Sequence, residues 1–323
     1  MNLRYVLNII CYNANMDIKN CKLVFLGTPM IAAQVLLKLI AINSNIVAVL
    51  TQPTKPFGRG LKLTTSEVER VARVNNLPLY KPESAVDIEK TLVDLKPDIL
   101  VVAAYGHILS KRSLASAKLG AVNVHGSLLP KYRGPSPIQT TILEGDKVAG
   151  ITFLKMTKKM DAGPILLKKS IPVKADETSR SLTDKLTTLA CDEIEETLVN
   201  YLNGNIRLKE QENESATFCH LISKNDGLIC WESSATKIHR QIRAYNPWPM
   251  AFTYWEKEKL IILSSATTKL KLSPGQVRLI NGQLLVGTST TALELLSLKP
   301  AGKKIMTAQD FMNGHLQIDN YIF

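Results

Sequence analysis

The fold is decided first by residues 22–50, which read KLVFLGTPMIAAQVLLKLIAINSNIVAVL. A short apolar run ends at Gly27, after which Ile31, Val35 and Leu39 recur every four residues, as on one face of a helix. A second apolar run follows at Ile46–Leu50. Strand, helix and strand in this order predict a βαβ unit, the beginning of an open parallel sheet in an α/β protein.

The same stretch is apolar enough to be mistaken for a membrane span. Pro29, Lys38, Asn43 and Asn45 interrupt it, and its period changes partway, so strand–helix–strand is the better interpretation. The sequence thus predicts no membrane association.

Residues 1–20 are interpreted as an N-terminal extension. The apolar run near its start is short and split by Asn8, which makes secretion a poor explanation. Met16 is a candidate for the native start. We expect a cytoplasmic protein. The alternative is a mitochondrial one in which this extension is a presequence.

Further elements follow from the same kind of pattern. Helices are predicted at residues 66–74, Ala85–Leu95 and 182–202, and strands at residues 99–104, 121–124, 151–156 and 165–171. Residues 203–216 are polar and suit an exposed linker. Short strand-like pieces at residues 260–263, 276–280 and 283–286 then predict a small β-rich domain. The expected domains are residues 21–203 and 217–323, joined by a linker at residues 204–216.

Composition places few limits on function. The 323 residues include 40 Lys and Arg against 28 Asp and Glu, a net charge of +12 that suits a polyanionic partner such as nucleic acid. The five cysteines include no C-x-x-C pair and the five histidines no H-x-x-x-H pair. We therefore expect reduced thiols and no metal site.

The stretch most informative about chemistry is residues 123–137, NVHGSLLPKYRGPSP. Asn123 and His125 stand two apart at the end of a predicted strand, so their side chains project to the same side. Ligands of open α/β sheets bind at the carboxyl ends of strands. Asp161 lies in a later D-A-G-P turn that can approach this pair.

An amide, an imidazole and a carboxylate suit acyl transfer through a tetrahedral intermediate. Asn123 and a protonated His125 can donate to an oxyanion, and Asp161 can hold the imidazolium or help to remove protons. The chain has no G-x-S-x-G nucleophile motif. Direct transfer between two bound substrates is therefore expected.

This stretch resembles the folate-dependent formyltransferases, whose pattern is N-x-H-x-S-L-L-P followed shortly by R-G. The resemblance implies 10-formyltetrahydrofolate as formyl donor, an amine as acceptor, and Asn123, His125 and Asp161 as the catalytic trio. It implies a Rossmann-like catalytic domain followed by an OB-like barrel. The positions it implies for folate binding are Tyr105, Gly106, Ser127, Leu128, Leu129 and Pro130.

Within this family, the resemblance is greatest to members whose amine is carried by methionyl initiator tRNA. This resemblance rests on three segments, which are FLGTP at residues 25–29, GRGLK at residues 58–62 and RAYNPWP at residues 243–249. The implied role is in translation initiation, and we expect a monomer.

Charge supports tRNA as a partner. Residues 18–66 hold six cations and no carboxylate, and prolines and glycines make residues 52–63 an extended, flexible basic loop. Mobile Lys and Arg side chains of this kind contact phosphates. The positions predicted to bind tRNA are Lys55, Arg59, Lys62 and Arg243.

Other functions remain open at this point. The same chemistry could act on a small amine, such as an amino-sugar nucleotide or glycinamide ribonucleotide. A non-catalytic RNA-binding protein on the same scaffold is a second alternative. A nicotinamide dehydrogenase is less favoured, because Gly27 stands alone rather than within G-x-G-x-x-G.

Overall fold

The structure, a computed structural model, describes residues 17–57 and 62–323, with only the backbone at 55–57 and 62–64. Most of the expected N-terminal extension and Arg59 lie outside the described residues. The chain divides into two compact units. The first takes in the described residues up to Pro135 with Gly150–Ile171 and Thr183–Phe218, and the second takes in Ser136–Ala149, Pro172–Leu182 and Cys219–Phe323. Each is described by itself.

The first unit is built on a seven-stranded sheet in the order β5-β2-β1-β6-β7-β8-β9. Its strands are β1 (Leu23–Gly27), β2 (Ile46–Leu50), β5 (Leu79–Tyr80), β6 (Ile99–Ala103), β7 (Ala121–His125), β8 (Val148–Lys155) and β9 (Ile165–Pro172). The pairs from β5 to β7 are parallel, and β8 lies antiparallel to β7. The predicted parallel α/β sheet is thus confirmed, with an antiparallel strand next to β7.

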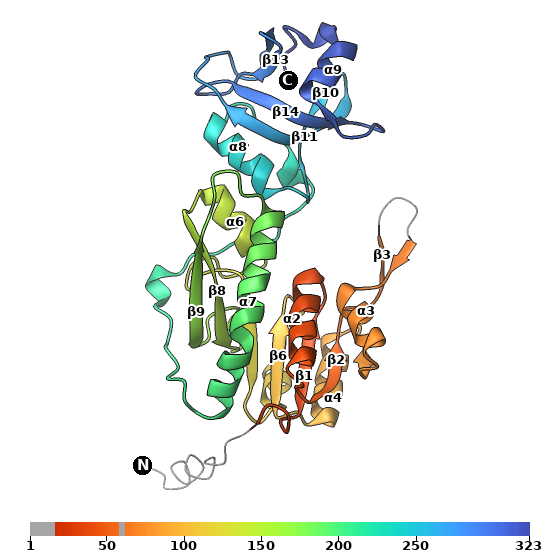
Figure 1. Cartoon of the computed structure of the whole chain (residues 1–323), viewed down its shortest axis with the longest axis vertical. Helices are drawn as coiled ribbons and strands as arrows, with labels where there is room; N and C mark the ends of the chain where they lie inside the picture. The colour runs from red at the N-terminus through yellow and green to blue at the C-terminus, as the bar shows by residue number, and fades with distance from the viewer. Residues whose placement is uncertain (1–16, 58–61) are drawn as a thin grey trace. The chain divides into compact units, whose positions relative to one another are not determined.

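Most helices of this unit were predicted from the sequence, although the short helix at Lys111–Ala115 was not. The helices are α2 (Met30–Ala41), α3 (Glu67–Val74), α4 (Ala85–Leu95), α5 (Lys111–Ala115) and α7 (Ser179–Leu202), labelled in part in Figure 1. The Ser66 hydroxyl caps α3 by accepting from the Glu69 amide. Ile88 and Leu92 of α4 pack against Leu26 of β1 in one buried cluster, while every residue of β1 is buried. Helices therefore cover a sheet that is apolar on both faces.

The basic loop is more ordered than expected at its flanks. β3 (Lys55–Phe57) and β4 (Lys62–Thr64) form an antiparallel hairpin in which Lys55 pairs with Thr64 and Phe57 with Lys62. Residues 52–63 were expected to form an extended, flexible loop. That expectation is corrected at residues 55–57 and 62–63, where backbone pairing holds the chain in two strands.

The second unit contains an antiparallel sheet and three helices. Its sheet order is β10-β11-β14-β13-β12, with β15 paired to β14. The elements are α6 (Pro137–Glu144), α8 (Ala235–Ala244), β10 (Ala251–Trp255), β11 (Glu258–Thr267), β12 (Val277–Ile280), β13 (Gln283–Val286), β14 (Leu293–Pro300), β15 (Met306–Thr307) and α9 (Ala308–Gly314). Ile238, Ile242 and Phe311 are fully buried in its core. The β-rich second domain is thus confirmed, while its helices α6, α8 and α9 were not predicted.

Candidate active site

Asn123 and His125 lie at the carboxyl end of β7, between β6 and β8. The register pairs Asn123 with Val102 on one side and with Leu154 on the other. Because side chains alternate along a strand, residues 123 and 125 face the same side of the sheet. The carboxyl ends of β1 and β6 lie at the same edge, which is where open α/β sheets bind ligands.

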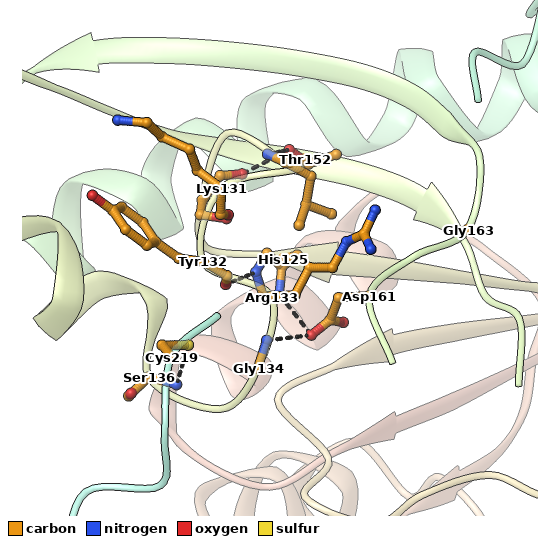
Figure 2. Close-up of polar contacts among 12 residues, drawn as sticks. His125, Lys131, Tyr132, Arg133, Gly134, Ser136, Thr152, Asp161, Gly163 and Cys219 are labelled. Carbon is orange, nitrogen blue, oxygen red and sulfur yellow. Dashed lines mark hydrogen bonds and ion pairs between the residues drawn. The ribbon is translucent and has the colours of Figure 1, made fainter. Parts of the chain in front are cut away.

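Both ring nitrogens of His125 face groups of the protein. Nε2 lies 3.0 Å from the carbonyl oxygen of Tyr132, and Nδ1 lies 3.6 Å from Oδ2 of Asp161. A carbonyl oxygen can only accept, so Nε2 carries a hydrogen. Figure 2 shows the ring between these two partners. The structure thus brings together His125 and Asp161, which are far apart in the sequence.

The protonation state of His125 is governed by its burial. The side chain is 5% exposed. Desolvation lowers its pKa below the ordinary value of 6.5, against the opposing effects of the Asp161 carboxylate and the Tyr132 carbonyl. The resting imidazole is therefore neutral at pH 7, whereas a protonated ring was expected from the sequence. With hydrogen on Nε2, the neutral ring presents the Nδ1 lone pair toward Asp161 and can take up a proton there.

Asp161 is held in a turn between β8 and β9. Its φ of +49° lies in the left-handed region, which non-glycine residues enter at a cost. Its Oδ2 accepts from the Gly134 amide at 2.9 Å, as Figure 2 shows. At Gly163, in the same turn, a Cβ atom would collide with the backbone oxygen of Lys155. The turn is therefore packed closely against the end of β8.

The loop after His125 is fixed by its own hydrogen bonds. The Ser127 hydroxyl donates to the Lys131 carbonyl at 2.6 Å, and the Thr152 hydroxyl donates to the Ser127 carbonyl at 2.6 Å and accepts from the Leu129 amide at 3.1 Å. Leu129 is fully buried beside Leu154. The Leu129 side chain thus packs in the interior, while Leu128 and Pro130 are half-buried.

Tyr105 and Gly106 follow β6, the neighbour of β7. The Tyr105 carbonyl accepts from the Thr28 hydroxyl and from the Gln52 side-chain amide, each at 3.1 Å. The Tyr105 ring is buried, which raises the pKa of its hydroxyl. Gly106 has a φ of +82°, and a Cβ atom there would meet the Gln52 amide. These residues lie at the same sheet edge as β7, with the Tyr105 side chain in the core.

The predicted tRNA-binding residues are distributed between the two units. Lys55 and Lys62 lie on the hairpin arms, and Arg59 is outside the described residues. Arg243 is on α8 of the second unit, where its guanidinium donates to the Glu177 carbonyl at 2.9 Å. That contact gives Arg243 a structural partner within its own unit.

Several residues at the site carried no recognisable signal in the sequence. Tyr132 and Gly134 act through their backbone atoms, which no side-chain pattern reveals. Gln211 lies in the stretch interpreted as an exposed linker, yet it is 8% exposed and donates to the Asp161 carbonyl. The expectation of exposure is therefore wrong for Gln211, although most of its neighbours are exposed.

Two features of the described residues bear on other functions. Over residues 17–57 and 62–323, no three His, Cys, Asp or Glu side chains gather in a way that could hold a metal ion. No helix in the same ranges is long and apolar enough to cross a membrane.

The sequence matches two known domain families in tandem. Residues 21–198 match the family described as formyl transferase, and residues 221–316 match the formyl transferase C-terminal domain. Among curated proteins, the methionyl-tRNA formyltransferase of Desulfotalea psychrophila is 41% identical over 301 residues, covering 92% of this chain and 93% of that protein. The methionyl-tRNA formyltransferase of Chloroflexus aggregans is 40% identical over 299 residues, covering 91% of this chain and 97% of that protein.

Solved structures share the fold at lower identity. An N-formyltransferase from Helicobacter canadensis, in complex with folinic acid and dTDP-3-aminofucose, aligns with a TM-score of 0.66 at 20% identity, over 85% of this chain and 98% of that one. HypX from Aquifex aeolicus, in complex with tetrahydrofolic acid, aligns with a TM-score of 0.63 at 14% identity, over 92% of this chain and 48% of that one.

Proposed function

The chain belongs to the formyl transferase family, and from this premise we propose that it formylates the α-amino group of methionine esterified to initiator tRNA. It thereby serves translation initiation, as a methionyl-tRNA formyltransferase. The observation that carries this function is the 41% identity to a protein of that name over more than nine-tenths of both chains. Small-amine acceptors are not favoured, because the solved N-formyltransferase from Helicobacter canadensis, in complex with dTDP-3-aminofucose, is only 20% identical.

The formyl donor in this proposal is 10-formyltetrahydrofolate. Support comes from the family and from the sheet edge beside His125, where the hydrogen-bonded loop at Ser127–Leu129 follows β7 and the turn at Gly106 follows β6. Open α/β sheets bind their ligands at such an edge. A cytoplasmic monomer, and the domain boundaries at residues 203 and 217, stay predictions.

The reaction joins the methionine nitrogen to the formyl carbon and breaks the bond from that carbon to N10 of the folate. An α-amino group has a pKa of about 7.7–8.0, so much of it arrives protonated and must lose a proton before it can attack. Neutral His125 can accept that proton, and the Asp161 carboxylate 3.6 Å away stabilises the resulting imidazolium.

Attack on the formyl group produces a tetrahedral intermediate with an oxyanion. The side-chain amide of Asn123 is the proposed donor to that oxygen, and the positive charge of the His125 imidazolium stabilises it electrostatically. Collapse of the intermediate returns a proton to N10 of the folate and releases tetrahydrofolate. Asp161 contributes both to the attack of the amine and to the collapse of the intermediate, because it orients the imidazole and balances its charge.

The test of this function is direct. Purified protein is incubated with 10-formyltetrahydrofolate and with methionylated initiator tRNA or elongator tRNA, and the formyl-methionine released from each tRNA is quantified. We expect product from initiator tRNA alone. Absence of product on both tRNAs, with formylation of a small amine, would assign the acceptor to the alternative class.

The basic hairpin offers a prediction for tRNA binding. Arg59→Ala and Lys62→Ala should each raise KM for tRNA by roughly 3- to 10-fold. The increase of this KM with salt concentration should be less steep than in the wild type, because fewer phosphates are neutralised. KM for the folate donor should hardly change. The control is Lys90→Ala, an exposed lysine on α4, which should behave as the wild type. Unchanged constants in both loop variants would remove the hairpin from tRNA recognition.

A further inference from the structure

The site includes a glutamine from a segment distant in sequence, and its side chain is almost fully enclosed. Gln211 is 8% exposed. Its amide nitrogen donates to the backbone carbonyl of Asp161 at 2.8 Å and to that of Gly163 at 2.7 Å. Since a primary amide has two hydrogens, both are used to hold the turn that carries the Asp161 carboxylate.

The orientation of this amide is set by Arg133. The Nε and Nη2 atoms of Arg133 both donate to Oε1 of Gln211, at 3.1 and 2.9 Å. A guanidinium has only donors, so its partner must be the amide oxygen, which leaves Nε2 of Gln211 facing the two carbonyls. Arg133 is itself 5% exposed. The contact is thus made in the interior, where a lost hydrogen bond leaves a buried polar group unsatisfied.

Asp161 depends on such support because its backbone is left-handed, with a φ of +49°. Its carboxylate is anchored separately, by the Gly134 amide at 2.9 Å. Gly134 directly follows Arg133 in the chain. The contacts therefore form a closed ring that runs from Asp161 through Gly134 and Arg133 to Gln211 and back to Asp161. Figure 2 shows the part of this ring at Arg133, Gly134 and Asp161. All four residues belong to the first unit.

We propose that Gln211 is a positioning residue for formyl transfer, which holds the Asp161 turn so that its carboxylate faces the imidazole of His125. The inference rests on the proposed function, because it concerns the roles assigned there to Asp161 and His125. Gln211 acts on the reaction only through Asp161. A displacement of about 1 Å in such a group is enough to cost roughly 10²-fold in rate.

Two substitutions separate positioning from structural support. Gln211→Met keeps the length of the side chain and removes all its polar contacts. Gln211→Glu keeps an oxygen for Arg133 but cannot donate to the carbonyls of Asp161 and Gly163. We expect kcat to fall about 10- to 100-fold in both variants, with KM for folate and for tRNA within about threefold of the wild type. The Tm of each variant is measured as well, because Gln211→Glu gives Arg133 a charged partner but turns a carboxylate oxygen toward the two carbonyl oxygens.

Two neighbours in the same segment provide controls. Glu212→Gln changes an exposed side chain and should leave kcat and Tm as in the wild type. Asn213→Ala removes an oxygen that accepts from Arg133 at 3.0 Å and so loosens Arg133, while the Gln211 contacts to the Asp161 turn remain. Tm should fall in Asn213→Ala with kcat reduced far less than in Gln211→Met.

The outcomes are distinguishable. A kcat loss in both Gln211 variants that does not follow Tm across the series supports the proposal. Wild-type kcat in Gln211→Met, or a kcat that simply follows Tm through Gln211→Met, Gln211→Glu and Asn213→Ala, overturns it. A wild-type protein that formylates neither tRNA would instead overturn the proposed function.

Discussion

The variant His125→Ala is expected to lose formylation almost completely, with kcat reduced by about 10²- to 10⁴-fold. The imidazole lies 3.6 Å from the Asp161 carboxylate and can accept a proton from the incoming amine near neutral pH. Its burial keeps its pKa below 6.5, so at pH 7 it is neutral and able to accept that proton. Alanine can neither accept a proton nor carry the positive charge that stabilises the oxyanion.

Folding must be measured alongside activity in this variant. His125 is 5% exposed, so alanine leaves a small cavity and deprives the Tyr132 carbonyl of its donor. The stability cost of an unsatisfied buried acceptor is about 1–3 kcal/mol, which lowers Tm without unfolding the protein at assay temperature. His220→Ala is the matched control, because the His220 side chain is 69% exposed. Near-normal turnover in folded His125→Ala would remove His125 from the mechanism.

The second large effect is expected at Asn123. Asn123→Ala removes an oxyanion donor, and the loss of one such donor typically costs about 10²- to 10³-fold in kcat. Because the donor acts on charge that develops only during the reaction, KM for either substrate should change little. Asn123→Asp should be at least as inactive as Asn123→Ala, since a carboxylate in the same place repels the developing oxyanion.

A control of the same chemical type is Asn205→Ala, on an exposed residue after α7. It should keep wild-type kcat and Tm. If Asn123→Ala keeps most of its kcat, the oxyanion role is refuted. If the variant loses activity only through a higher KM, the amide binds substrate in the ground state instead. Single-turnover rates with saturating folate and tRNA distinguish these cases.

The regular elements were predictable wherever one physical pattern dominated. The helix α4 has the predicted bounds, Ala85–Leu95, because a serine cap and spaced apolar residues agree there. The helices α6 and α8 were not predicted. α6 begins at Pro137 in a stretch rich in glycine and proline, which favours a loop. α8 is mostly polar outside its buried face at Ile238 and Ile242, so tertiary packing rather than local pattern stabilises it.

By itself, the sequence determined what short-range geometry controls: the βαβ start at residues 22–50, and the shared face of Asn123 and His125, since strand side chains alternate with a period of two. Only the tertiary structure decided what contacts that strand end. Asp161 reaches His125, and Gln211 reaches Asp161, because β7, β8 and the segment after α7 fold together. Such long-range contacts, several made by backbone atoms, have no periodic signature in a sequence, and the burial that sets the pKa of His125 exists only once they form.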